Sequence, residues 1–268
     1  MIRSDNHVHT SFSTDSDTPM EQMVLKGIEL DLSSICFTDH IDYDFPDMGN
    51  GVEFLFDVDE YFAKLAALKE SYPQFELRRG VEIGLKPDLT ERCNALVHGY
   101  PFDFVIGSTH LVDNVDPYYP AFWEQYSEKE GIRRYYELTM ENIKTGIDFD
   151  VYGHIDYVVR YGPNQNRQYS YGRYKEILDE ILRTLIRKNI GIELNTGGYH
   201  YGLGEPNPCV NVIRRYRELG GEIITIGADA HTPDKIAYAF DRAADVLRDC
   251  GFSYYTVFKN RQPVFHKL

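Results

Sequence analysis

Residues 1–40 read MIRSDNHVHTSFSTDSDTPMEQMVLKGIELDLSSICFTDH, and they contain the unit from which the fold can be predicted. A short strand is expected at 3–8. The run TPME at 18–21 predicts a capping box with proline at the first helical position, and apolar residues at helical spacing follow it to residue 28. An apolar segment at 33–37 then predicts a second strand. The unit is therefore strand, helix, strand, with short polar segments between them.

The same alternation continues along the whole chain. Further strands are expected at 77–83, 102–106, 150–152, 190–194, 223–226 and 254–258. Helical patterns occupy 57–68, 128–146, 174–186, 210–219 and 239–250. Repeated β-then-α units, about seven of them, imply parallel strands joined by helical crossovers, and their closure gives an irregular barrel related to the eight-fold TIM barrel. A doubly wound open sheet is the alternative architecture.

Composition and charge limit the class of protein. Because no linker-like or low-complexity segment interrupts residues 1–268, a single domain is expected. The 42 acidic residues exceed the 28 basic ones, which gives a net charge of −14 and argues against a nucleic-acid or anionic-membrane partner. No run approaches 18 apolar residues, the N-terminus lacks an apolar signal core, and the four cysteines form no CxxC pair. A cytoplasmic protein is expected, and its oligomeric state is left open.

Histidines and carboxylates collect where the expected strands end. These candidates are His7, His9, His40, Glu82, His110, His154, Asp229 and His231. In a parallel barrel all those ends converge on one face, so residues far apart in the sequence would form one site. Imidazole and carboxylate without thiolate suit Zn²⁺, Fe²⁺ or Mn²⁺. With Asp15 the set exceeds what one ion needs, which favours two or three ions that share a bridging carboxylate.

Each of these residues also has a simpler interpretation. A single histidine after a strand is commonly a hydrogen-bonded polar residue, Glu82 could be an ion-pair partner, and Asp229 with His231 could cap the next helix. Their joint placement at strand ends is what favours a metal site. A structural metal site is disfavoured because such sites are compact and rich in thiolates. The remaining histidines are scattered and are interpreted as structural: His98, His200 and His266.

The motifs at these strand ends resemble those of the PHP (polymerase and histidinol phosphatase) superfamily of metal-dependent phosphoesterases. The matching motifs are HVH at 7–9, TDH at 38–40, GVE at 80–82, STH at 108–110, GH at 153–154 and ADAH at 228–231. They are ordered along almost the whole chain. The run GHIDYVVRYG at 153–162 is most similar to the stand-alone histidinol-phosphate phosphatases of histidine biosynthesis.

The resemblance implies a distorted (β/α)7 barrel that holds three divalent ions, of zinc, iron or manganese. Their implied ligands are His7, His9, Glu82 and Asp229 for the first, Glu82, His110 and His154 for the second, and His40, His231 and Asp15 for the third. Glu82 would bridge the first two ions. Many relatives have histidine where this chain has Asp15, and a carboxylate can also ligate a divalent ion.

The activity implied by the resemblance is that of a histidinol-phosphatase, which hydrolyses the small phosphate monoester L-histidinol phosphate to L-histidinol and phosphate. A hydroxide that bridges two ions would be the nucleophile. Asp229 or His231 would protonate the leaving group, and the sequence does not choose between them. Arg160 is expected to bind the phosphate. Asp42 and Asp113 are candidates for the cationic half of the substrate, although either could equally be a solvated loop acid.

Three other functions remain open on the sequence. A PHP-type nucleotidase or phosphodiesterase would use the same metal chemistry, but the acidic composition weighs against it. A protein-tyrosine phosphatase is a second possibility. From a different class, the chain could be a non-catalytic metal-binding module, which would hold metal and release no phosphate.

Overall fold

The computed structural model describes residues 2–47, 51 and 53–268. In these described residues an eight-stranded parallel sheet has seven strands along its path, in the order β1-β2-β4-β5-β6-β7-β8, and a short eighth strand that pairs with β4 beside that path. Their bounds are β1 (Ser4–Val8), β2 (Ser34–Phe37), β4 (Glu76–Gly84), β5 (Phe104–Ser108), β6 (Val151–Tyr152), β7 (Gly191–Asn195) and β8 (Ile224–Gly227). The ends of β1 and β8 meet, since Val8 forms a parallel bridge with Ala230. The sheet is thus nearly closed into a barrel, and the expected distorted (β/α)7 barrel is confirmed.

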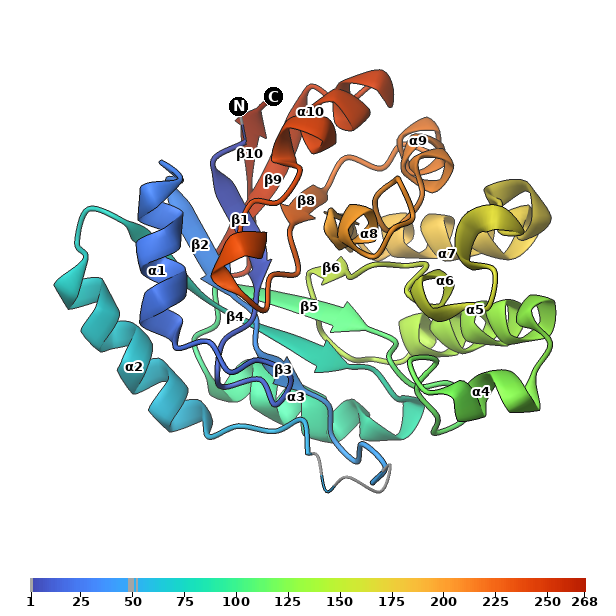
Figure 1. Cartoon of the computed structure of the whole chain (residues 1–268), viewed down its shortest axis with the longest axis horizontal. Helices are drawn as coiled ribbons and strands as arrows, with labels where there is room; N and C mark the ends of the chain where they lie inside the picture. The colour runs from blue at the N-terminus through green and yellow to red at the C-terminus, as the bar shows by residue number, and fades with distance from the viewer. Residues whose placement is uncertain (1, 48–50, 52) are drawn as a thin grey trace.

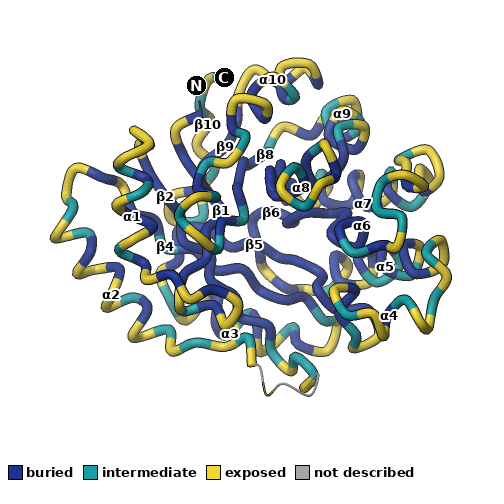
Figure 2. Tube along the Cα trace, viewed as in Figure 1, coloured by how far each residue is buried: buried dark blue, intermediate teal, exposed yellow. Residues whose placement is uncertain are grey.

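Helices surround the strands on the outside of this barrel (Figure 1). The α-helices are α1 (Met20–Glu29), α2 (Val58–Ser71), α3 (Thr90–Gly99), α4 (Pro120–Gln125), α5 (Glu128–Lys144), α6 (Val158–Tyr161), α7 (Lys175–Arg187), α8 (Gly197–His200), α9 (Val210–Glu218) and α10 (Phe240–Asp249). Short 3₁₀ turns are η1 (Pro87–Leu89), η2 (Gln165–Arg167), η3 (Tyr171–Arg173) and η4 (Pro233–Lys235). Figure 2 shows the strands buried and the outer faces of the helices exposed. In the described part of the chain, every helix is too short or too polar to cross a bilayer.

The helix signals in the sequence were partly right. The apolar stripe expected at 174–186 is the buried face of α7, and Asp57 caps α2 by accepting a hydrogen bond from the Glu60 amide at 3.0 Å. The capping box at 18–21 is wrong. Helix α1 has no side-chain cap, because the Thr18 hydroxyl instead donates to the His231 carbonyl at 3.0 Å. That bond ties the start of α1 to the loop after β8.

The strand expected at 254–258 exists but lies outside the barrel sheet. It is β9 (Tyr254–Lys259), which pairs with the unexpected β10 (Gln262–Lys267) as an antiparallel hairpin. The hairpin packs across the amino ends of the barrel strands. Its Thr256 hydroxyl accepts from the Ile224 amide at 3.3 Å, and its Arg261 side chain pairs with Asp150, just before β6, at 2.6 Å. A second unexpected strand, β3 (His40–Ile41), pairs with β4.

An apolar layer divides the inside of the barrel. Its buried members are Cys36, Phe104, Ile106, Val151 and Phe258, and the rings of Phe104 and Phe258 stack at 5.1 Å between centroids. Phe258 comes from the hairpin, so β9 supplies part of the floor of the barrel. Polar side chains lie on either side of this layer. The carboxyl end of the barrel holds the site described next.

Candidate active site

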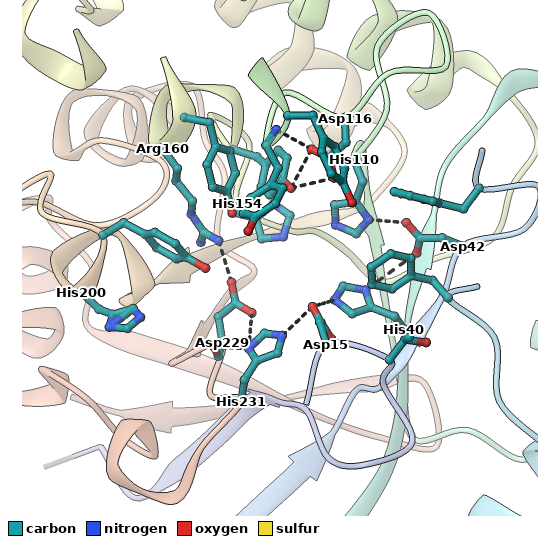
Figure 3. Close-up of a pocket in the computed structure, with 18 of the residues that line it drawn as sticks. Asp15, His40, Asp42, His110, Asp116, His154, Arg160, His200, Asp229 and His231 are labelled. Atoms are coloured by element: carbon teal, nitrogen blue, oxygen red, sulfur yellow. Dashed lines mark hydrogen bonds and ion pairs between the residues drawn. The ribbon is translucent and has the colours of Figure 1, made fainter. Parts of the chain in front are cut away.

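The carboxyl ends of the strands bring the predicted metal ligands together in one cluster. Figure 3 shows the ligands that line the adjacent cavity, which are Asp15, His40, His110, His154, Asp229 and His231. Strand β1 supplies His7 and leads to His9, β3 supplies His40 and β4 supplies Glu82. The segments after β5, β6 and β8 supply His110, His154, Asp229 and His231, and the loop between β1 and α1 supplies Asp15. Residues that are up to 224 positions apart, from His7 to His231, thus lie together at the carboxyl end of the barrel.

Glu82 lies at the centre of this cluster and is fully buried. Five imidazole nitrogens lie within 3.5 Å of its carboxylate. Those near Oε2 belong to His7 at 3.0 Å, His40 at 3.3 Å and His9 at 3.5 Å, and those near Oε1 belong to His154 at 3.0 Å and His110 at 3.3 Å. The Ser108 hydroxyl also donates to Oε1 at 2.6 Å. One carboxylate therefore faces two sets of imidazoles, as a bridging ligand would.

The donor atoms are spaced closely enough to hold cations. Four groups of three ligand atoms lie within 4.8 Å of one another: His9, His40 and His231; His7, His9 and Glu82; His40, Asp42 and His110; and Glu82, His110 and His154. Among the described residues, His9 Nε2 and His40 Nδ1 are buried, and although a carboxylate oxygen lies 3.3 Å from each of them, neither nitrogen makes a hydrogen bond. A buried polar nitrogen without a partner is costly, and a divalent cation would satisfy both. The residues present fit such ions.

Asp229 and Asp15 complete the cluster on its outer side. Asp229 Oδ1 lies 3.3 Å from His9 Nε2 and 3.6 Å from His7 Nε2. Asp15 Oδ2 lies 3.1 Å from His231 Nε2 and 3.7 Å from His40 Nε2. Burial raises the pKa of Asp15, but the neighbouring imidazoles outweigh burial and hold that pKa below its usual value. Asp15 is thus an ionised carboxylate beside two histidines.

Further polar groups fix the orientation of the imidazoles. His7 Nδ1 bonds to Glu193 Oε1 at 2.6 Å, and His110 Nδ1 bonds to Asp42 Oδ2 at 2.6 Å. A carboxylate on the far nitrogen orients a histidine ligand and leaves its other nitrogen free to bind metal. Glu193 was missed as a site residue, although its place at the end of β7 in the sequence matched the pattern that identified Glu82.

The charges inside the cluster depend on one another. Burial lowers the pKa of His40, but the Glu82 and Asp15 carboxylates outweigh it and raise that pKa to about 9. Burial alone would raise the pKa of Glu82, but His7, His40 and His110 hold it well below its usual value. Without metal, protons on these imidazoles supply the positive charge that Glu82 needs. A metal ion would take their place, so metal binding must release protons.

A cavity of about 690 Å³ opens beside the cluster. Besides the predicted ligands it is lined by aromatic and charged side chains that include Asp116, Tyr118, Tyr157, Arg160, Tyr161, His200, Tyr201 and Lys235. Asp116 accepts hydrogen bonds from the Tyr118 amide at 2.8 Å and the Tyr157 hydroxyl at 3.1 Å, and burial raises its pKa to about 6. Sequence reasoning missed Asp116. It also assigned His200 a purely structural role, whereas His200 lines this cavity.

The three residues expected to contact substrate are placed differently. Arg160 lines the cavity but is buried, and it donates to Asp229 Oδ2 at 2.8 Å as well as to two asparagines, Asn195 and Asn207. Asp42 lines the cavity with its carboxylate engaged by His110. Asp113 is not brought to the cavity. Its carboxylate lies on the surface, where Arg134 donates to it at 2.7 and 2.9 Å.

Comparisons with known proteins point to one family. Residues 5–197 match the model of the PHP domain. The chain is 33% identical over 264 residues to a probable histidinol-phosphatase of Clostridium acetobutylicum, and the match covers 97% of this chain and 95% of that protein. It is 30% identical over 254 residues to the histidinol-phosphatase of Lactococcus lactis, with 94% and 93% covered.

A solved structure is similar over nearly the full length. The crystal structure of histidinol phosphate phosphatase from Lactococcus lactis, complexed with zinc, L-histidinol and phosphate, matches with a TM-score of 0.90 at 29% identity and covers 98% of each chain. A putative histidinol phosphatase from Listeria monocytogenes matches with a TM-score of 0.78 at 20% identity, which supports the fold.

Proposed function

The chain belongs to the PHP domain family and is of the histidinol-phosphatase type, and from this premise we propose that it hydrolyses L-histidinol phosphate to L-histidinol and phosphate. The observation that carries the proposal is Glu82, a fully buried carboxylate between two sets of imidazoles at the mouth of a barrel, beside a cavity of about 690 Å³. We further propose a role in histidine biosynthesis, a cytoplasmic location and a single PHP-type domain that spans residues 1–268.

Three divalent ions, with zinc the leading candidate, are the proposed cofactors. The first would be held by His7, His9, Glu82 and Asp229, the second by Glu82, His110 and His154, and the third by Asp15, His40 and His231. The distances within the cluster support this division, because Glu82 offers one oxygen to each of two imidazole sets. When bound, such ions supply positive charge that acidifies water and neutralises phosphoryl oxygens.

The geometry favours Asp229 over His231 as the group that moves the proton. His231 Nδ1 bonds to the Asp229 carbonyl at 3.0 Å, and its Nε2 would ligate the third ion, so neither nitrogen would be left to protonate the leaving group. Burial raises the pKa of Asp229, but His7 and Arg160 hold it well below its usual value. Asp229 is therefore ionised at rest, so it can first take the proton of the attacking water and then return it to the leaving alkoxide.

Arg160 has two functions in this proposal. Its bond to Asp229 Oδ2 directs Oδ1 of that carboxylate toward the histidines, and its guanidinium faces the cavity from which phosphate would arrive. The contact with phosphate itself stays a prediction. Asp42 is better placed to orient His110 than to bind substrate, because its Oδ2 already accepts the 2.6 Å bond from that histidine.

For the organic half of the substrate we propose Asp116 in place of Asp113. L-histidinol carries an ammonium group and an imidazole, and a carboxylate among aromatic rings suits both. Asp116 lines the cavity, and its Oδ2 accepts a hydrogen bond from the Tyr157 hydroxyl at 3.3 Å. Asp113 does not line the cavity and is paired with Arg134 instead. An ammonium group at Asp116 would also hold its carboxyl in the ionised form.

The test is a substrate panel on the metal-loaded protein. L-histidinol phosphate, phosphotyrosine and nucleoside monophosphates are assayed for phosphate release, and the metal content is measured on the same sample. We expect the highest kcat/KM for L-histidinol phosphate. Preference for a nucleotide or for phosphotyrosine would favour the other PHP-type activities, and full metal content without phosphate release would indicate a binding module.

A further inference from the structure

The amino end of the barrel contains a second charged cavity, on the far side of the apolar layer from the metal ligands. It has a volume of about 220 Å³ and is lined by Arg3, Ser4, Ser33, Ser34, Glu76, Arg78, Tyr255, Val257, Lys259 and His266. Strands β1, β2 and β4 form one wall and the β9–β10 hairpin forms the other. Because side chains alternate along a strand, Arg78 and Glu82 share one face of β4, roughly 13 Å apart along it.

Arg78 is the central residue of this cavity. It is only 2% exposed, yet among the described residues no carboxylate lies within 4.0 Å of its guanidinium. Its Nη2 donates to the Ser34 hydroxyl at 2.9 Å and its Nη1 to the Phe258 carbonyl at 3.4 Å, while its Nε has no partner in the described chain. A buried charge without a counter-charge is strongly unfavourable, so an anion beside Arg78 would stabilise this arrangement.

The neighbouring charges do not supply that anion. Glu76 is the acid that lines the cavity, and its carboxylate is bound by Lys259 at 2.9 Å. Arg3, which directly precedes β1, is paired at 2.8 Å with Asp31, a residue that does not line the cavity. The cavity wall therefore carries three cationic side chains and one acidic one. This balance contrasts with the chain as a whole, whose net charge is −14.

The other polar groups of the cavity suit an oxyanion. The hydroxyls of Ser4 and Ser34 lie 2.8 Å apart, so one of them can turn its proton toward a ligand. His266 Nε2 is buried and has no partner among the described residues. A water molecule occupies about 30 Å³ in the liquid, so the cavity has room for a tetrahedral oxyanion and a few waters.

We propose that this cavity binds a tetrahedral oxyanion of the size of phosphate or sulfate, held by Arg78 with Ser34, Ser4, His266 and Lys259. The anion would neutralise Arg78 and join three barrel strands to the hairpin that closes the amino end. Since the apolar layer that contains Phe104 and Phe258 separates it from the metal ligands, the site would stabilise the fold without taking part in hydrolysis.

The test measures Tm of the metal-loaded protein in HEPES buffer as sodium phosphate or sodium sulfate is added. A ligand at about 100 times its Kd should raise Tm by roughly 5 °C in a chain of this size. Phosphate can also bind at the metal centre, so the informative quantity is the difference between the wild type and Arg78→Met. The matched control is Arg79→Met, on the same strand, whose side chain pairs with Asp103 on the other face.

We expect the wild type and Arg79→Met to gain stability from sulfate and Arg78→Met to lose most of that gain. An equal gain in Arg78→Met, or a gain only at molar salt, would overturn the proposal. Lys259→Gln, at the exposed rim, tests the same point if Arg78→Met does not fold, and it should weaken the response. A crystal soaked in selenate gives a direct readout. Anomalous density beside Arg78 Nε supports the site, and density at the metal centre alone contradicts it.

Discussion

Strand β4 carries a buried charge at each end of one face, and the two charges differ in how they are compensated. Glu82, at the carboxyl end, faces five imidazole nitrogens within 3.5 Å. Arg78, at the amino end, has no described carboxylate within 4.0 Å. A buried charge of either sign needs compensation. At the carboxyl end the protein itself supplies the compensating charge, on imidazoles whose protons a metal ion would replace. At the amino end the compensating charge would come from a small anion.

The largest expected effect comes from removing the charge at the carboxyl end. Glu82→Ala deletes the oxygens that two sets of imidazoles share, so metal content and kcat should both fall sharply. We expect kcat to fall by more than about 100-fold, which is the upper limit for loss of a residue that only orients a metal ligand. Elemental analysis and phosphate release measure the two quantities. Glu76→Gln, at the other end of the same strand, is the control and should keep kcat. Normal turnover by Glu82→Ala would refute a bridging role.

Disrupting the apolar layer between the two ends of the barrel should lower the stability of the protein and leave its activity nearly unchanged. Phe258 is 3% exposed and stacks on Phe104, so Phe258→Ala should lower the free energy of unfolding by about 3–5 kcal/mol. At a temperature where the variant is folded, kcat should stay close to that of the wild type, because in the described chain no hydrogen bond or ion pair joins the hairpin to a proposed metal ligand. Chemical denaturation and steady-state assays measure both. A large loss of kcat in the folded variant would mean that the floor of the barrel positions the site.

A smaller effect is expected from a residue that only orients a ligand. Glu193 accepts the 2.6 Å bond from His7 Nδ1. Glu193→Gln keeps the shape but loses the charge, and kcat or metal affinity should fall by about 10–100-fold. Because Glu193 acts through His7, added metal should restore part of the activity of the variant, whereas Glu82→Ala should respond little. Failure of excess metal to rescue Glu193→Gln would assign this residue a different role.

The sequence predicted the carboxyl end of the barrel much better than its amino end. Strand ends are easy to predict, since an apolar run that stops at a polar residue marks both the strand and its end, and this pattern located His7, Glu82, His154 and Asp229 together. It did not locate Arg78 as a buried residue, because nothing local indicates that a later hairpin will cover it. The β9–β10 pairing depends on where α10 ends in space.

The same reason explains why the sequence did not indicate which acids face the cavity. Asp113 and Asp116 follow β5 in one loop, and only the path of that loop decides which carboxylate faces the cavity. Asp113 has a positive φ of 50° and turns toward Arg134, whereas Asp116 is buried against Tyr157. The place of His200 beside the cavity was likewise not predicted, because α8, a four-residue helix, gives too short a pattern to detect.

These two acids give the last and smallest prediction. Asp116→Asn should raise KM for L-histidinol phosphate by about tenfold, because a buried charge-assisted hydrogen bond contributes about 1.5–3 kcal/mol, and it should leave kcat nearly unchanged. Asp113→Asn removes a surface pair with Arg134 and should change KM less than twofold and stability by under about 1 kcal/mol. Steady-state kinetics on both variants test the assignment. If Asp113→Asn instead raised KM and Asp116→Asn did not, the first expectation from the sequence would be right and the cavity beside the cluster would not be where the organic half of the substrate binds.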